Sequence, residues 1–160
     1  MLYRLATELA APVVTPLLKR RRNGVSPDFA KSFFNPLEKT GKMPEKGAIW
    51  LHCASAGEVV AAQPLIEALQ AKKTPLFVTL WSPNGVIRLH QLFGDQVPWS
   101  WLPWDRLGPL SRWMDALSPA ELWVLETELW PHLLLAAREA DVPVRIVNAR
   151  ITHKTLRAPA

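Results

Sequence analysis

The feature that most constrains the fold is a regular alternation, from residue 48 onward, between short apolar runs and longer amphipathic stretches. The apolar runs have the length and composition of strands and occupy residues 48–53, 75–80, 96–102, 121–126 and 143–149. The stretches between them have helical periodicity and occupy residues 58–71, 85–93, 109–117 and 131–140. Strands that alternate with helices imply right-handed crossovers and a parallel sheet covered on both faces. We therefore predict an α/β, Rossmann-like fold, a parallel sheet with flanking helices.

The composition indicates one folding unit with extensions. A chain of 160 residues is long enough for one domain with a substantial core and short for two. Charged residues make up 21% and hydrophobic residues 49% of the chain, which is the ordinary globular mixture and argues against disorder. Eight tryptophans are many for this length and are typical of an interface, a sugar-binding surface or a membrane margin.

Several classes of chemistry have no motif in this sequence. Cys53 is the only cysteine, and the four histidines have no cysteine partners at the spacing of zinc ligands. Neither of the common glycine-rich nucleotide motifs is present, and the G-x-S-x-G elbow of many α/β hydrolases is missing as well. We expect no metal and no cofactor, and we interpret Cys53 as a small buried residue.

The positive charge is confined to the first part of the chain. The net charge is +5, and the surplus lies within the first 50 residues, where nine Lys or Arg stand against four acidic residues. The remaining residues are balanced, so we expect no nucleic-acid partner.

Residues 1–22 combine an amphipathic stretch, which is helical in pattern up to Pro12, with the four consecutive cations Lys19, Arg20, Arg21 and Arg22. The stretch is too short and too interrupted to span a bilayer, and the cations follow the apolar residues, whereas in a signal peptide they precede them. We predict a segment that associates with an anionic membrane surface; the alternative is a frayed arm with solvated charges. Residues 23–47 are predicted to be a linker, and residues 48–160 the folded domain.

Four loops should meet at one edge of the sheet. In a parallel sheet, ligands bind beyond the carboxyl ends of the strands, and loops follow the first, second, fourth and fifth predicted strands there. Their polar or glycine residues are candidates for a single site: Ser55, Gly57, Glu58, Ser82, Asn84, Gly85, Glu126, Glu128, Asn148 and Arg150.

Glu58 allows two interpretations from the residues alone. The stretch Ser55-Ala56-Gly57-Glu58 matches the capping box, in which Ser55 is the N-cap and Glu58 occupies the third helical position. Glu58 could also accept a proton in catalysis. The positive end of the helix dipole lowers the pKa of such a carboxylate and makes it a poorer base, unless burial raises the pKa again.

The sequence "ETELWP" carries a second acidic pair. Glu126 and Glu128 alternate along a segment expected to be extended, so they should point to opposite sides. One could face the site while the other caps the helix that begins at Pro131. Trp130 could belong to the core or to the rim of the site, and we favour the core.

The motifs "WLHCASAGEV", "TLWSPNG", "LFGD", "LPWD", "ETELWPHLL" and "VNARIT", in this order and spacing, resemble the amino-terminal half of the Kdo transferases of lipid A biosynthesis. The resemblance covers about residues 45–155. These 3-deoxy-D-manno-octulosonic acid (Kdo) transferases are membrane-associated, inverting glycosyltransferases with two Rossmann-like domains. The resemblance implies that this chain is the acceptor domain of a GT-B glycosyltransferase, truncated, without the C-terminal donor-binding domain.

The resemblance also implies a reaction and a set of roles. Kdo would pass from CMP-Kdo to a lipid A precursor in lipopolysaccharide biosynthesis, at the cytoplasmic face of the bacterial inner membrane. Glu58 matches the general base of the family's S-x-G-E loop. The other positions that match substrate-binding segments are Ser55, Gly57, Asn84, Gly85, Glu126, Glu128, Asn148 and Arg150.

The missing second domain leaves a further alternative open. Because that domain makes most contacts with the donor in the family, we expect the chain to be inactive by itself. A membrane-docked binding module or a remnant without catalysis is the alternative interpretation.

Overall fold

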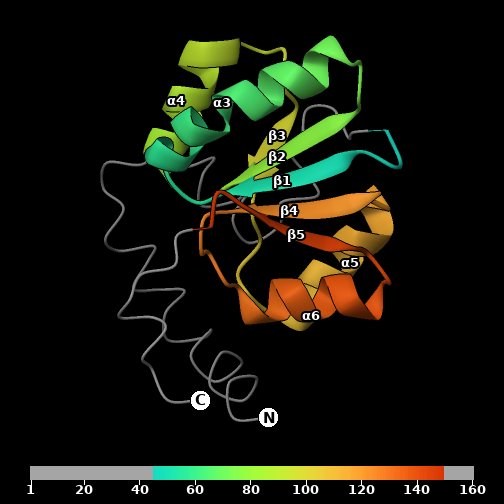
Figure 1. Cartoon of the computed structure of the whole chain (residues 1–160). Coiled ribbons are helices and arrows are strands. Elements are labelled where there is room, and N and C mark those ends of the chain that lie inside the picture. Colours follow the sequence, from blue (N-terminus) through green and yellow to red (C-terminus); the bar gives the residue numbers. More distant parts are fainter. Residues whose placement is uncertain (1–44, 150–160) are drawn as a thin grey trace.

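Five strands and four helices alternate along the part of the chain that the computed structural model describes, residues 45–149 (Figure 1). The strands are β1 (Ile49–Cys53), β2 (Leu76–Leu80), β3 (Trp99–Trp101), β4 (Glu121–Leu125) and β5 (Val144–Val147). The helices are α3 (Ala56–Ala71), α4 (Pro83–Phe93), α5 (Leu107–Leu117) and α6 (Pro131–Glu139). The predicted segment 1–22, nearly all of the linker 23–47 and residues 150–160 lie outside the described range.

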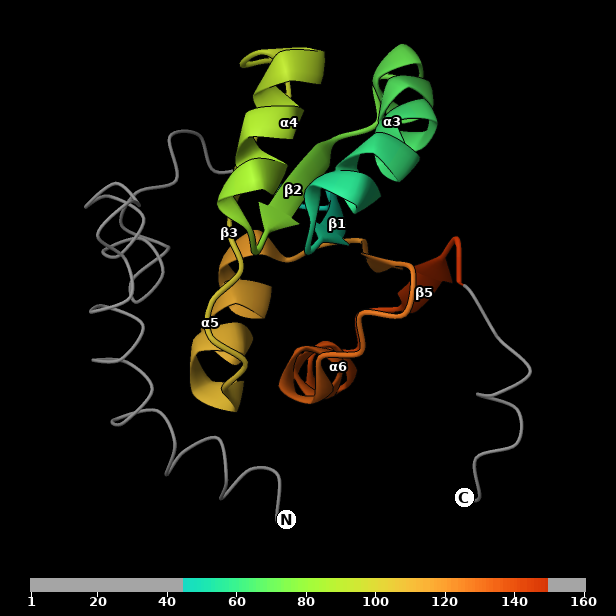
Figure 2. The same cartoon turned by 90° about the vertical axis from the view of Figure 1, so that its left-hand side faces the viewer.

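The strands form one parallel sheet in the order β3-β2-β1-β4-β5. Helices α3 and α4 cover one face of the sheet, and α5 and α6 cover the other, as two perpendicular views show (Figures 1 and 2). The predicted α/β, Rossmann-like fold is therefore confirmed. The strand order reverses between β1 and β4, and in open α/β sheets such a switch point is where ligands bind.

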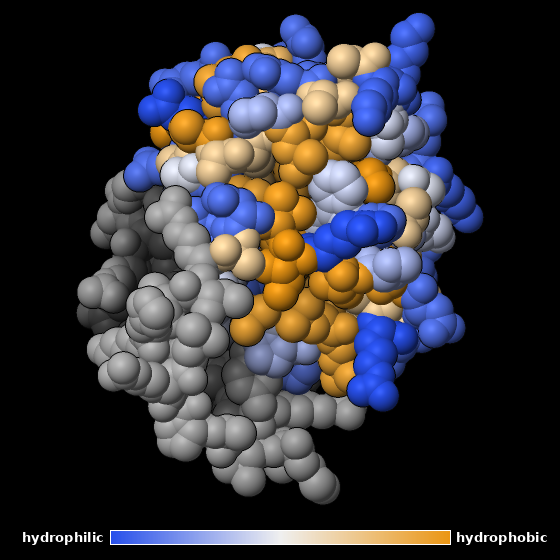
Figure 3. Space-filling model, viewed as in Figure 1, coloured by the Kyte–Doolittle hydropathy of each residue, from blue (hydrophilic) through white to orange (hydrophobic). Residues whose placement is uncertain are grey.

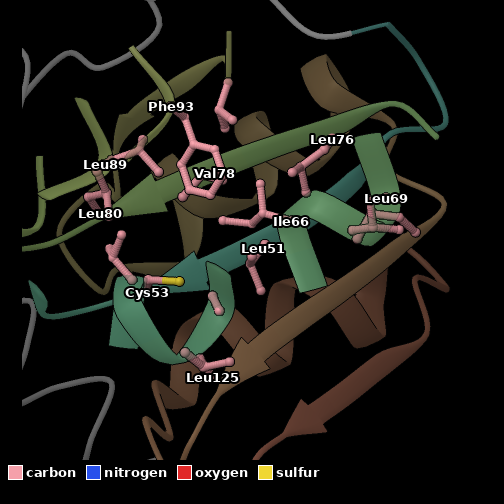
Figure 4. Close-up of a cluster of buried hydrophobic side chains, with 14 of the residues drawn as sticks. Leu51, Cys53, Ile66, Leu69, Leu76, Val78, Leu80, Leu89, Phe93 and Leu125 are labelled. Atoms are coloured by element: carbon pink, nitrogen blue, oxygen red, sulfur yellow. The ribbon is translucent and has the colours of Figure 1, made fainter. Parts of the chain in front are cut away.

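Strand β1 divides its side chains between two cores. Leu51 and Cys53 pack toward α3 and α4 with residues such as Ile66, Val78 and Leu89 (Figure 4). This explains why Cys53 is fully buried, as its position in an apolar run predicts. Each aliphatic side chain that is fully buried in this way contributes about 1.5–3 kcal/mol relative to exposure.

Aromatic residues dominate the second core, beneath α5 and α6. Trp50 of β1 and Phe77 of β2 each place their ring 5.7 Å, centroid to centroid, from the ring of Trp113 on α5. Tilted ring pairs at this distance are favourable beyond the area that they bury. These rings attach α5 to the two central strands.

Serine caps set the first residues of α3 and α4. Ser55 accepts a hydrogen bond from the Glu58 backbone N–H, and Ser82 accepts one from the Gly85 N–H. Both helices begin directly after their caps, two residues before the predicted starts at 58 and 85. Helix α5 also begins two residues earlier than predicted, at Leu107.

Helix α6 begins at Pro131, as predicted, but its cap comes from another part of the chain. The Asp105 carboxylate, in the loop between β3 and α5, accepts hydrogen bonds from the backbone N–H of His132 (3.3 Å) and Leu133 (3.0 Å). His132 Nδ1 also lies 2.8 Å from the Asp105 carbonyl oxygen. The prediction that Glu126 or Glu128 caps this helix was therefore wrong.

Strand β5 forms an edge of the sheet and carries apolar side chains on its surface. Val144 is 39% exposed and Ile146 is 47% exposed, and apolar residues cross the middle of this face in Figure 3, where β5 lies in Figure 1. Between them, Arg145 donates two hydrogen bonds to the Glu121 carboxylate, one of them at 2.8 Å, and lowers the Glu121 pKa to about 2. Among residues 45–149, no helix has the length and apolar character needed to cross a membrane.

Replacing Asp105 by alanine should lower the free energy of unfolding by about 2 kcal/mol, because two buried backbone N–H groups at the start of α6 lose their acceptor. Urea denaturation followed by circular dichroism would measure the loss. Asp115→Ala, on the exposed face of α5, serves as the control and should change stability little. Equal stability of the two variants would show that water replaces the Asp105 cap without loss.

Candidate active site

The loops after β1 and β2 touch at the carboxyl edge of the sheet. Gly85 lies in the first turn of α4, and a Cβ atom there would sit 3.6 Å from the backbone carbon of Ser55 and 3.2 Å from Ser82 Oγ. A side chain at this position would crowd the contact, so Gly85 allows α4 to approach the start of α3. Ser55, Ser82 and Gly85 are thus brought together as the sequence predicts.

Glu58 occupies the predicted capping position and is engaged through both of its carboxylate oxygens. Oε1 accepts a hydrogen bond from Ser55 Oγ at 2.7 Å, and Oε2 accepts one from the Ala54 backbone N–H at 2.8 Å. The Ser55 hydroxyl oxygen accepts in turn from the Glu58 N–H at 3.3 Å. Glu58 is 5% exposed, so the carboxylate that takes part in this cap is also nearly buried.

Burial decides the proton affinity of Glu58. Loss of solvation raises the pKa of its carboxyl group above the ordinary value, while the hydrogen bonds from Ser55 and Ala54 act in the opposite direction. The negative charges of Glu128 and Glu126 raise the pKa further. Burial therefore outweighs the effects that lower the pKa, and Glu58 is a stronger base than an ordinary glutamate.

The same pKa shift affects folding. A carboxyl group whose pKa is raised in the folded state gives its full contribution to stability below its ordinary pKa, and the contribution is lost as the pH rises through the folded value. Ionised Glu58 thus destabilises the fold near neutral pH.

The acidic loop does not have the extended conformation assumed from the sequence. Strand β4 ends at Leu125, and Glu126 adopts a left-handed conformation with φ of 57°. Strict alternation therefore does not apply to Glu126 and Glu128, and both carboxylates act on the pKa of Glu58. The premise that placed them on opposite sides was wrong. A left-handed backbone costs a non-glycine residue about 1–3 kcal/mol and is often found at functional sites.

The remaining predicted site residues lie at the rim of this edge. Gly57 and Asn84 are exposed in the first turns of α3 and α4. Asn148 is exposed just after β5, with φ of 58°, and is adjacent to Val147, whose carbonyl oxygen accepts from the Glu126 N–H at 2.8 Å. Arg150 and the cations Lys19, Arg20, Arg21 and Arg22 lie outside the described residues.

The loop after β3 also reaches this edge and was missing from the four loops predicted to form it. The ring centroid of Trp104, in that loop, lies 6.0 Å from that of Trp81, which follows β2. The Trp81 ring centroid lies 4.7 Å from that of Trp130, which precedes α6. Trp130 is half-buried and packs against the margin of a core cluster, so it lies between the two positions considered, core and rim. A usable signal was present, because each of these tryptophans lies within a few residues of the carboxyl end of a strand.

Trp130 connects this aromatic cluster (Trp81, Trp104 and Trp130) to the acidic loop. Its indole Nε1–H donates a hydrogen bond to Glu128 Oε2 at 3.2 Å. The position of the Glu128 carboxylate therefore depends on the position of an aromatic ring. Within residues 45–149, no cluster of three or more His, Cys, Asp or Glu side chains could hold a metal ion.

The chain matches a known protein family. Residues 28–159 match a family model described as 3-deoxy-D-manno-octulosonic-acid transferase (kdotransferase). The chain is 33% identical, over 163 aligned positions, to the 3-deoxy-D-manno-octulosonic acid transferase of Bordetella pertussis, and the match covers 97% of this chain. It is 36% identical over 114 positions, or 70% of this chain, to the enzyme of the same name from Haemophilus influenzae.

A more distant relative is a plant protein, the probable mitochondrial 3-deoxy-D-manno-octulosonic acid transferase of Arabidopsis thaliana, at 27% identity over 98% of this chain. The matched region is 38% of the Bordetella protein, 27% of the Haemophilus protein and 35% of the plant protein. The chain thus spans about a third of the length of these relatives.

Ser55→Ala should raise the pKa of Glu58, because it removes a hydrogen bond that favours the carboxylate. Carbon-13 NMR titration of labelled glutamate side chains would follow Glu58 directly, with Glu58→Gln identifying the signal. Ser82→Ala is the matched control, since it removes the equivalent cap of α4 at a similar cost of about 1 kcal/mol without touching Glu58. An unchanged Glu58 titration in Ser55→Ala would mean that the Ser55 hydrogen bond has little influence on the carboxylate.

Proposed function

The chain belongs to the 3-deoxy-D-manno-octulosonic acid transferase family, and from this membership we propose that it is the N-terminal, acceptor-binding part of a glycosyltransferase of lipopolysaccharide biosynthesis. The proposed reaction transfers Kdo from CMP-Kdo to a lipid A precursor, with inversion at the anomeric carbon. The observation that carries the proposal is Glu58, a nearly buried carboxylate with a raised pKa at the switch point of a parallel sheet.

Glu58 acts as the general base in this proposal. Its carboxylate removes the proton of an acceptor hydroxyl while the acceptor oxygen forms a bond to the anomeric carbon of Kdo. The bond from that carbon to the CMP phosphate oxygen breaks, and its electron pair leaves with CMP. A phosphate is a good leaving group without protonation, so one base is enough for the reaction.

The surroundings of Glu58 favour this role. Each of its oxygens accepts one hydrogen bond, and a carboxylate oxygen can accept two, so both retain capacity for an incoming proton or hydroxyl. The nearby charges of Glu126 and Glu128 disfavour ionised Glu58 and so support uptake of a proton. We propose that one of these two carboxylates also binds the acceptor.

The other substrate contacts are proposed from the positions of residues at the same edge of the sheet. Ser55, Gly57, Asn84 and Gly85 surround the N-termini of α3 and α4, where backbone N–H groups and the helix dipoles attract anionic groups. Asn148 and Arg150 follow β5, and we assign them to the acceptor side by their place after the strand. An acceptor that carries phosphate would suit these helix ends.

A membrane-bound acceptor would also explain the N-terminal cations. We propose that residues 1–22 dock the protein on the anionic cytoplasmic face of the bacterial inner membrane. Four cations near such a surface contribute roughly 4 kcal/mol at most, which is enough for reversible docking.

The alternative function is a binding module that holds the acceptor without transferring sugar to it. Binding of the lipid without transfer by the 160-residue chain would favour this binding module over a complete catalyst.

Glu58→Gln should reduce the transfer rate by about 10²- to 10⁴-fold, the usual effect of removing a general base. The assay uses a protein that carries these residues together with the donor-binding part, and it measures the mass of the lipid after incubation with CMP-Kdo. Glu67→Gln, on the exposed face of the same helix, is the control and should keep wild-type turnover. Wild-type turnover by a folded Glu58→Gln protein would limit Glu58 to its capping role.

The chain should co-sediment with vesicles containing anionic lipid at low salt, and replacing Arg20, Arg21 and Arg22 by glutamine should release most of it. Vesicles of neutral lipid provide the control. Equal sedimentation of both proteins with both kinds of vesicle would contradict electrostatic docking.

A further inference from the structure

A buried polar network lies on the α5/α6 side of the sheet, one strand residue before the loop that carries Glu58, and the proposed mechanism does not use it. His52 of β1 and Thr79 of β2 are paired across the two strands, and both are fully buried. Trp50 Nε1–H donates a hydrogen bond to Thr79 Oγ1 at 2.8 Å, and His52 Nδ1 lies 3.0 Å from the same oxygen.

The Thr79 hydroxyl contacts the Nδ1 side of the His52 ring. Thr79 Oγ1 accepts from Trp50 Nε1–H, and it can either donate its own proton to His52 Nδ1 or accept a hydrogen from it. Burial lowers the pKa of His52 to about 4, so the ring is neutral near pH 7. A neutral imidazole carries its hydrogen on one of its two nitrogens, so Nε2 is either a donor or an acceptor.

His52 Nε2 is fully buried and has no hydrogen-bond partner among the described residues. A buried polar group without a hydrogen-bond partner lowers the stability of the fold, so the group that lies beside Nε2 is important. The His52 ring meets the Trp130 ring edge-on, with centroids 5.8 Å apart and an interplanar angle of 89°. In this arrangement the N–H of one ring can contact the π face of the other.

Trp130 connects His52 to the acidic loop. It is fixed on one side by His52 and on another by Trp81, and its own N–H donates to Glu128. Glu128 is one of the two carboxylates whose charge acts on Glu58. A continuous set of contacts therefore links a histidine in the sheet to a carboxylate beside the proposed base.

We propose that His52 is a positioning residue for the acidic loop: it seats Trp130, and Trp130 holds the Glu128 carboxylate near Glu58. This inference rests on the proposed function only in its consequence for catalysis, because the placement of Glu128 can be measured without turnover. Among the described residues, the other titratable groups that interact with Glu58 are Glu126 and the thiol of Cys53. The thiol stays protonated because burial raises its pKa well above the usual range.

The test is a carbon-13 NMR titration of Glu58 in the 160-residue chain, with the indole N–H signal of Trp130 as a second readout. His52→Leu, Trp130→Phe and Glu128→Gln should each lower the pH at which Glu58 titrates, because the charge of Glu128 is displaced or removed. His52→Leu combined with Glu128→Gln should lower it no further than Glu128→Gln alone. The Trp130 signal should also move in His52→Leu.

A matched control exists on β4, the strand before the acidic loop. Trp123 Nε1–H donates to the Glu121 carboxylate two residues before it, as Trp130 does to Glu128. Trp123→Phe removes an equivalent pair away from the site and should leave the Glu58 titration unchanged.

Two results would overturn the proposal. One is a folded His52→Leu protein with unchanged Glu58 titration and an unchanged Trp130 signal, which would make His52 a space-filling core residue. The other, which decides the matter if His52→Leu does not fold, is an unchanged Glu58 titration in Trp130→Phe. The transfer assay on Glu58→Gln reports separately on the proposed function, so a failure of one is distinguishable from a failure of the other.

Discussion

The structure depends on the burial of β1 on both of its faces. This strand pairs with β2 on one side and with β4 on the other, and all five of its residues are buried. Its alternate residues begin two separate cores, one under α3 and α4 and one under α5 and α6. Because the chain order reverses at β1, the loops after β1 and β4 emerge side by side, and Glu58 and the acidic loop are brought together by strand pairing.

Much of the fold could be predicted from the sequence because the signals are local. Apolar runs bounded by turns predicted all five strands, and Ser55 and Glu58 predicted the capping interaction at α3. The errors arose where a contact joins distant residues. Asp105 caps a helix that begins 26 residues later, and no spacing rule within one helix could have found it. The loop with Trp104 was overlooked, although the strand before it was predicted at residues 96–102.

The candidate site was predictable in its members and less so in its electrostatics. Ser55, Glu58 and Gly85 meet as expected, because parallel strands place their following loops at one edge. The sequence left the pKa of Glu58 undecided between the helix dipole and burial, and only the packing around it settles the balance. The left-handed turn at Glu126 also has no signal in the sequence, since glutamate rarely adopts it. Stability near neutral pH is lowered by the same burial that strengthens Glu58 as a base.

The strand order also determines when during synthesis the domain can close. Ile49 of β1 pairs with Leu76 of β2 and with Glu121 of β4, so one side of β1 has its neighbour long before the other. A chain that emerges from the ribosome N-terminus first can assemble β1, β2, α3 and α4 while the rings of Trp50 and Phe77 still lack the helix that covers them. Parallel sheets with such distant pairings fold slowly. The aromatic core under α5 and α6 is therefore the surface that the nascent protein must keep from aggregation until the second half of the sheet has been made.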